Sequence, residues 1–126
     1  MNLTTNEWRE FIEHGIPEGW WTAFGKQMCD DIEAYIKKLL PGARENFEIL
    51  QVKEKYGSLR IYTNWCTKEL QDIERKYEDL SVHTCCICGA PATKISTGWI
   101  CPYCDEHAPE NSIPINDFLT DSIKEV

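Results

Sequence analysis

The sequence predicts an α+β fold in which helices pack on one β-hairpin and a short cysteine-rich segment follows them. Two observations carry this prediction. Apolar residues recur at helical spacing in separate stretches, and one stretch between them alternates apolar and charged residues around a Tyr-Gly-Ser turn. With 126 residues, of which 42% are hydrophobic and 27% charged, the chain has the composition of a globular domain with one core.

The first helix is expected directly after the N-terminal residues. Thr4 and Glu7 are spaced as a capping box, in which each side chain bonds a backbone N–H group at the helix start. Behind them, apolar residues recur at helical spacing: Trp8, Phe11 and Ile12. The pair His14-Gly15 marks the expected end of this helix.

A longer second helix is expected after the connection 16–21, which contains proline and glycine. Thr22 is in position to cap it. One side of this helix is apolar, with Phe24, Met28, Ile32, Tyr35, Ile36 and Leu39. Pro41-Gly42 predicts its end, because both residues disfavour a helix interior.

The next elements are a hairpin and a third helix. Residues 47–55 are predicted as a strand, 56–58 as the turn and 59–63 as the returning strand. Either Thr67 or Asn64 can cap the following helix, whose apolar side carries Leu70, Ile73, Tyr77 and Leu80. A last short helix that docks on the core is expected from apolar residues near the C-terminus: Ile113, Ile115, Phe118, Leu119 and Ile123.

The cysteine-rich segment has the spacing of a metal site. Two residues separate Cys85 from Cys88 and Cys104 from His107, so a tight turn can direct each pair at one ion. The 15 residues between the pairs fit two such turns, which predicts a structural zinc site of Cys85, Cys88, Cys104 and His107. Cys101 is the alternative fourth ligand in place of His107. The fold prediction is thus α+β with a C-terminal zinc-knuckle or ribbon-like segment.

Two other roles for these cysteines are disfavoured. A disulfide framework fits poorly with seven cysteines, an odd number, and with a start that shows no signal-peptide pattern. The tetrapeptide Cys101-Pro102-Tyr103-Cys104 is identical to the redox pair of glutaredoxins. However, the 22 residues that follow it are too few for the rest of a thioredoxin-like fold.

The charge argues against a nucleic-acid partner. The net charge is −8, and after Ser81 two lysines stand against six acidic residues. Such a tail repels phosphate backbones, whereas zinc modules that bind DNA carry basic residues around their ligands.

We expect a core in residues 1–82 and a zinc-binding segment with an acidic tail in 83–126, packed together as one domain. No apolar run reaches the ~18 residues of a membrane span, and we expect a cytoplasmic protein.

Two blocks of the sequence form a specific pattern. The first, 47–62, reads Phe-Glu-Ile-Leu-Gln-Val-Lys-Glu-Lys-Tyr-Gly-Ser-Leu-Arg-Ile-Tyr, and the second, 84–107, contains Thr-Cys-x-x-Cys-Gly, Gly-Trp-Ile and Cys-Asp-Glu-His. In this order, the blocks resemble a group of small proteins common in tailed-phage and prophage genomes. That group has a non-cysteine where this chain has Cys101, which implies Cys104 and His107 as ligands. The resemblance implies an accessory role for a phage, such as binding a host protein, and no activity.

Two further sets of residues are candidates for binding. Lys53, Lys55, Tyr56 and Arg60 are expected to share a face of the hairpin, and such a cluster suits a nucleotide phosphate. An ordinary solvated charged face, neutralised by nearby glutamates, is the alternative. Trp20-Trp21 is the other set: adjacent residues seldom face the same core, so one tryptophan is expected to sit in a pocket of a partner.

Catalysis has little support in the sequence. A catalytic zinc ion keeps an open position beside a general acid or base, whereas three cysteines and one histidine form the closed structural type. We therefore expect a non-enzymatic phage accessory protein that binds a host macromolecule and inhibits a host defence system. The alternatives are a protein that sequesters a small signalling nucleotide and a zinc module associated with nucleic acid or transcription.

Overall fold

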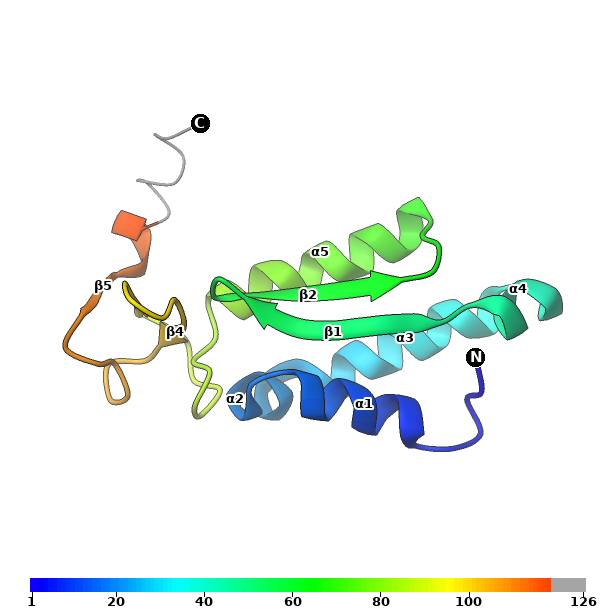
Figure 1. The fold of residues 1–126 in the computed structure, drawn as a ribbon, viewed down its shortest axis with the longest axis horizontal. Helices are drawn as coiled ribbons and strands as arrows, with labels where there is room; N and C mark the ends of the chain where they lie inside the picture. Colours follow the sequence, from blue (N-terminus) through cyan, green and yellow to red (C-terminus); the bar gives the residue numbers. More distant parts are fainter. Residues whose placement is uncertain (119–126) are drawn as a thin grey trace.

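The protein has an α+β fold, seen in a computed structural model that describes residues 1–118. Helices and a two-stranded hairpin form an elongated body, and a second small sheet lies at one end of it (Figure 1). Along the chain the elements are α1 (Glu7–Gly15), α2 (Glu18–Trp20), the π-helical η1 (Trp21–Gly25), α3 (Lys26–Lys38), α4 (Pro41–Asn46), β1 (Ile49–Lys55), β2 (Ser58–Thr63), α5 (Lys68–Val82), β3 (Lys94–Ser96), β4 (Pro102–Tyr103) and β5 (Ser112–Pro114).

The start of α1 differs from the predicted capping box. Asn6 stands at the N-cap, and within the described residues no side chain caps this helix. Thr4 is engaged elsewhere, since Asn2 Oδ1 accepts hydrogen bonds from its backbone N–H at 2.9 Å and from its hydroxyl at 2.6 Å. The capping-box prediction is wrong because this local asparagine turn competes for the threonine.

The long helix begins earlier than predicted. α2, η1 and α3 follow one another without a break, so Thr22 lies inside the helix and the prediction that it caps the helix is wrong. Pro17 stands at the N-cap with an extended ψ of 145°, and Glu18 places an acidic side chain in the first turn, where the helix dipole favours it. The helix ends at Lys38, and Pro41 then opens the unpredicted α4, because proline suits the first helical position.

The hairpin follows the prediction closely. β1 begins at Ile49, two residues after the expected start, and pairs antiparallel with β2. Tyr56 and Gly57 form the turn with φ of 52° and 83°, the positive values that match a two-residue turn to the strand twist. Thr67, one of the two predicted caps, begins α5 by accepting a hydrogen bond from the Leu70 N–H.

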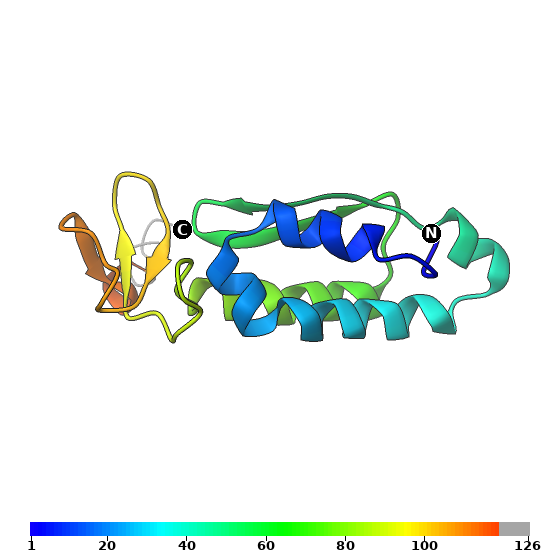
Figure 2. The same cartoon turned by 90° about the horizontal axis from the view of Figure 1, so that it is seen from below.

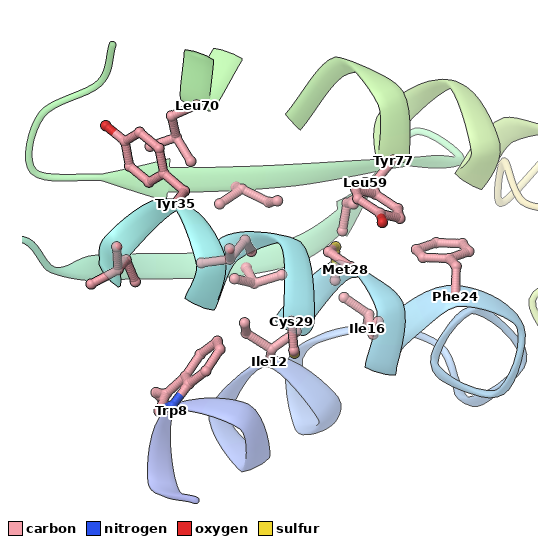
Figure 3. Packing of buried hydrophobic residues seen from close by; sticks show 14 of the residues in the cluster. Trp8, Ile12, Ile16, Phe24, Met28, Cys29, Tyr35, Leu59, Leu70 and Tyr77 are labelled. Carbon is pink, nitrogen blue, oxygen red and sulfur yellow. The ribbon is translucent and has the colours of Figure 1, made fainter. Parts of the chain in front are cut away.

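One core joins the helices and the hairpin. α1 packs along β1, α5 packs on β2, and α3 packs on α5. Figure 2 shows the hairpin and α1 on one side of the body and α3 and α5 on the other. Between them lie the buried side chains of Figure 3, which include Ile12, Phe24, Met28, Tyr35, Leu59, Leu70 and Tyr77. None of the described helices is both long and apolar enough to cross a membrane.

The small sheet has the order β4-β3-β5, and both pairs are antiparallel. The expected last helix is only partly present: Ile113 lies in β5, and helical backbone covers 115–118. Ile115 is buried, and its N–H bonds to the Thr93 carbonyl at 3.0 Å. These residues therefore extend the small sheet, whereas the predicted helical positions Leu119 and Ile123 lie outside the described residues.

Glu74 on α5 has an unsatisfied carboxyl group. Its Oε1 is buried and has no hydrogen-bond partner among residues 1–118. Burial, with a smaller contribution from the charge of Glu78, raises the pKa of Glu74 to about 7. Between pH ~4.5 and ~7 the folded protein therefore holds a proton that the unfolded chain has released, and stability falls as the pH rises through this range.

We predict that Glu74→Gln stabilises the protein at pH 8 and has little effect at pH 4.5. The expected gain in the free energy of unfolding is about 1–2 kcal/mol, reduced for solvent screening because the side chain is only half-buried. Urea denaturation at both pH values measures it. Glu110→Gln, an exposed change of the same charge, is the control, and an equal gain from Glu74→Gln at both pH values contradicts the prediction.

Candidate metal centre

Four predicted ligands meet at one point of the structure. The thiols of Cys85, Cys88 and Cys104 and the His107 ring place their ligand atoms within 4.8 Å of one another. Cys88 Sγ lies 3.7 Å from Cys104 Sγ, and His107 Nδ1 lies 3.2 Å from Cys104 Sγ and 3.9 Å from Cys85 Sγ.

These separations fit a tetrahedral ion. Metal–sulfur bonds of about 2.3 Å and metal–nitrogen bonds of about 2.0 Å at tetrahedral angles require sulfur atoms about 3.8 Å apart and sulfur–nitrogen pairs about 3.5 Å apart. The three distances scatter around these values. The cluster can therefore hold a metal ion with all four positions filled by protein atoms.

Two backbone turns produce this convergence. In the first, the Gly89 N–H bonds to the Cys85 carbonyl at 3.0 Å, and the Cys85 N–H bonds to the Ala90 carbonyl at 2.8 Å. Gly89 has φ of 82°, which favours glycine. In the second turn the His107 N–H bonds to the Cys104 carbonyl at 3.2 Å. Each two-residue spacer thus folds back on its first ligand.

Backbone N–H groups of both turns favour the thiolate form of Cys85. Burial opposes ionisation of this thiol, but backbone N–H groups of Cys88, Cys104 and Ile87 outweigh it and lower the pKa to about 6. Amide hydrogens that point at a sulfur atom stabilise its negative charge, as a metal-binding thiolate requires.

Cys101 lies outside this cluster. Its Sγ donates a hydrogen bond to Glu54 Oε1 at 3.6 Å, and it packs beside Cys86. The hydrogen bond with Cys86, together with burial, raises the pKa of Cys101 and keeps it a neutral thiol. Because Cys104 belongs to the metal cluster, the Cys101–Cys104 pair does not act together as the tetrapeptide alone suggests.

The metal segment is attached to the start of the long helix. The Gly19 N–H bonds to the Cys86 carbonyl at 3.0 Å, and a Cβ at position 19 would lie 2.2 Å from the Cys85 carbonyl oxygen. A Cβ on Gly89 would meet the Gly19 carbonyl at 2.6 Å. The two backbones therefore touch without intervening side chains, which two glycines permit.

Trp20 strengthens the same attachment. It is fully buried, and its Nε1 donates a hydrogen bond to the Thr84 carbonyl at 3.0 Å. Its ring is the first of a row of three. The centroids of the Trp20 and Phe24 rings lie 6.3 Å apart, and those of the Phe24 and Tyr77 rings lie 5.7 Å apart. Trp21 packs partly buried on Gly25. The indole N–H and ring of Trp20 are both used within the fold, so the expectation that one of these tryptophans sits in a partner's pocket stays a prediction for Trp21.

The hairpin candidates divide into two groups. Lys53, Lys55 and Tyr56 line a hollow at the hairpin tip. Arg60 lies opposite Lys53 in the strand register but does not line this hollow, and its buried Nε has no hydrogen-bond partner among residues 1–118. The sequence reasoning missed Trp99, which lines the other wall of the hollow, although its position after Gly98 in a short polar loop is a signal of exposure.

Comparison of the chain with protein-family models, with curated proteins and with solved structures finds no match.

We predict that Cys101→Ser retains the bound metal, whereas Cys104→Ser and His107→Ala lose it. Only the latter two remove an atom of the cluster, and metal loss then lowers stability because the ion holds the two turns together. Elemental analysis of the purified variants gives metal per chain, and thermal denaturation gives stability. Metal loss in Cys101→Ser with full retention in His107→Ala would mean that the fourth ligand is Cys101.

We also predict that Gly19→Ala destabilises the protein by about 2–3 kcal/mol or more. Its Cβ would collide with backbone atoms of the first metal turn, which cannot rotate away as a side chain can. Gly42→Ala is the control, since no described atom outside its chain neighbours and its own helix backbone lies within 4 Å of a Cβ there, and it should be neutral or stabilising by up to ~1 kcal/mol. Chemical denaturation measures both, and similar values for the two would refute the contact.

Proposed function

We propose that the cluster holds zinc and that the protein is a non-enzymatic binding protein. Three cysteines and one histidine in a closed tetrahedron are the ligand set of structural zinc sites. Such a set leaves no position for a substrate or an activated water. Glu106, the acidic residue between two ligands, is exposed to solvent, so it lacks the enclosed surroundings that a general acid or base needs. We expect elemental analysis of the purified protein to find more zinc than iron.

An exposed apolar groove carries the binding proposal. It lies between α1 and the hairpin and has a volume of about 690 Å³. Its lining includes the large apolar side chains of Phe11, Leu50 and Tyr62, together with the polar His14 and Gln51. These side chains are 48%, 55% and 42% exposed. Phe11 had the helical spacing of a core residue, yet α1 buries Trp8 and Ile12 instead. Grouped exposed apolar side chains of this kind mark contact sites for other proteins.

The partner that we propose is a host protein with an apolar side chain that fits this groove. The resemblance of the hairpin and cysteine blocks to tailed-phage proteins supports a host partner. We propose that the protein binds this partner in the cytoplasm of the infected cell and thereby inhibits a host defence system. The net charge of −8 disfavours a nucleic acid as the partner. Binding to duplex DNA that falls steeply between ~50 and ~200 mM salt would overturn this choice.

We predict that Leu50→Asp abolishes capture of the partner from host lysate and weakens binding to the purified partner by about 30-fold or more. A charged side chain in the centre of an apolar contact removes a hot spot of about 2 kcal/mol. Leu40→Asp is the matched control, because Leu40 is also highly exposed but lies outside the groove. Affinity capture with mass spectrometry, followed by calorimetry, tests both variants. Equal binding by both variants would exclude the groove.

A further inference from the structure

A second hollow lies where the hairpin tip meets the metal segment. It has a volume of about 320 Å³, and its two walls are residues 53–56 of the hairpin and residues 98–100 of the loop between β3 and β4. The volume is at the lower end of the range for small-molecule sites. Gly57 keeps the walls close, because its Cα side faces Ile100 and Ile95, which a Cβ would meet at 3.2 and 3.4 Å.

Two aromatic side chains stand open to solvent at this hollow. Tyr56 is 71% and Trp99 is 79% exposed. Rings this exposed do not contribute the large favourable free energy of burial that the more buried tryptophans contribute. Tyr56 also adopts φ of 52°, which is costly for a bulky residue, although glycine or asparagine would suit the turn better.

The loop that carries Trp99 is fixed by hydrogen bonds. Buried Ser96 donates its hydroxyl to the Trp99 carbonyl and accepts the Cys101 N–H at 3.0 Å. Its own N–H bonds to the Cys101 carbonyl at 3.0 Å. Ser96 thus closes the loop at its base, so the ring of Trp99 is presented from an ordered backbone. Ordering before binding reduces the entropy that a ligand must offset.

The hollow is basic in an acidic protein. Lys53 and Lys55 line it and form no ion pair with any carboxylate of residues 1–118, whereas Arg9, Lys37, Lys38, Lys68 and Lys76 all do. Their ammonium groups lie 5.8 Å from the ring centres of Tyr62 and Tyr56, respectively. Glu54 is the single acidic residue of the lining, and its Oε1 already accepts hydrogen bonds from the Gly57 N–H at 2.9 Å and from Cys101.

We propose that this hollow binds a nucleoside phosphate, with the base against Tyr56 and Trp99 and the phosphate beside Lys53 and Lys55. A planar base can stack on either exposed ring, a contact worth about 1–3 kcal/mol. The phosphate supplies the counter-charge that the two lysines lack within the described chain. The lining of this hollow shares no residue with that of the apolar groove, but Lys53 lies over the ring of Tyr62, which lines that groove. Nucleotide binding is therefore measured with the purified protein alone, without the host protein.

Calorimetry with the purified metal-loaded protein tests this proposal, using AMP, GMP, CMP, UMP and inorganic phosphate as probes at about 0.15 M salt. We expect at least one mononucleotide to bind one per chain with a dissociation constant below ~1 mM, and inorganic phosphate to bind at least ~10-fold more weakly. Failure of all four mononucleotides to bind, or phosphate binding as tightly as they do, would overturn the proposal.

Variants assign the binding to the hollow. Trp99→Ala should weaken nucleotide binding by ~5-fold to ~100-fold, and Lys53→Gln combined with Lys55→Gln by ~10-fold. Lys26→Gln combined with Lys37→Gln, the same charge change elsewhere, should leave binding unchanged. If Trp99→Ala lowers the melting temperature, Tyr56→Asn replaces it, because asparagine accepts the positive φ of the turn. Nucleotide binding that survives in both aromatic variants would exclude this site.

Discussion

The contact between the start of the long helix and the first metal turn connects the two parts of the structure. Gly19 bonds to Cys86 through its backbone, and Gly89 lies against the same helical turn without a side chain between them. The fully buried Trp20 extends this contact into the row of aromatic rings in the core. The metal segment is therefore fixed by backbone proximity, and its position determines where the loop 98–100 meets the hairpin.

Local patterns were enough to predict much of the fold. The hairpin, the helix capped by Thr67 and the two pairs of metal-ligand residues each depend on residues a few positions apart, and the structure has all of them. The choice of His107 over Cys101 also required knowledge of which residue lies beside Glu54. That neighbour is distant in the sequence, so spacing alone left the alternative open.

Several errors of the sequence analysis arise where a local pattern competes with contacts that the pattern does not reveal. The adjacency of Trp20 and Trp21 suggested that one of the two serves a partner, but a carbonyl 64 residues away accepts the indole N–H of Trp20. Phe11 has core spacing, yet the core beneath α1 is already filled by Trp8 and Ile12. Likewise, the hollow at the hairpin tip exists because two segments far apart in the sequence meet there.

The two walls of that hollow are stabilised by different means. The hairpin wall rests on apolar burial against α5, whereas the 98–100 wall belongs to a segment whose two turns bring four possible metal ligands together. A molecule that spans both walls would bind the metal-loaded form better than the metal-free form. By thermodynamic reciprocity it would then raise the affinity for the metal by the same factor. The fraction of protein that holds the ligand and the fraction that holds the metal would thus rise and fall together.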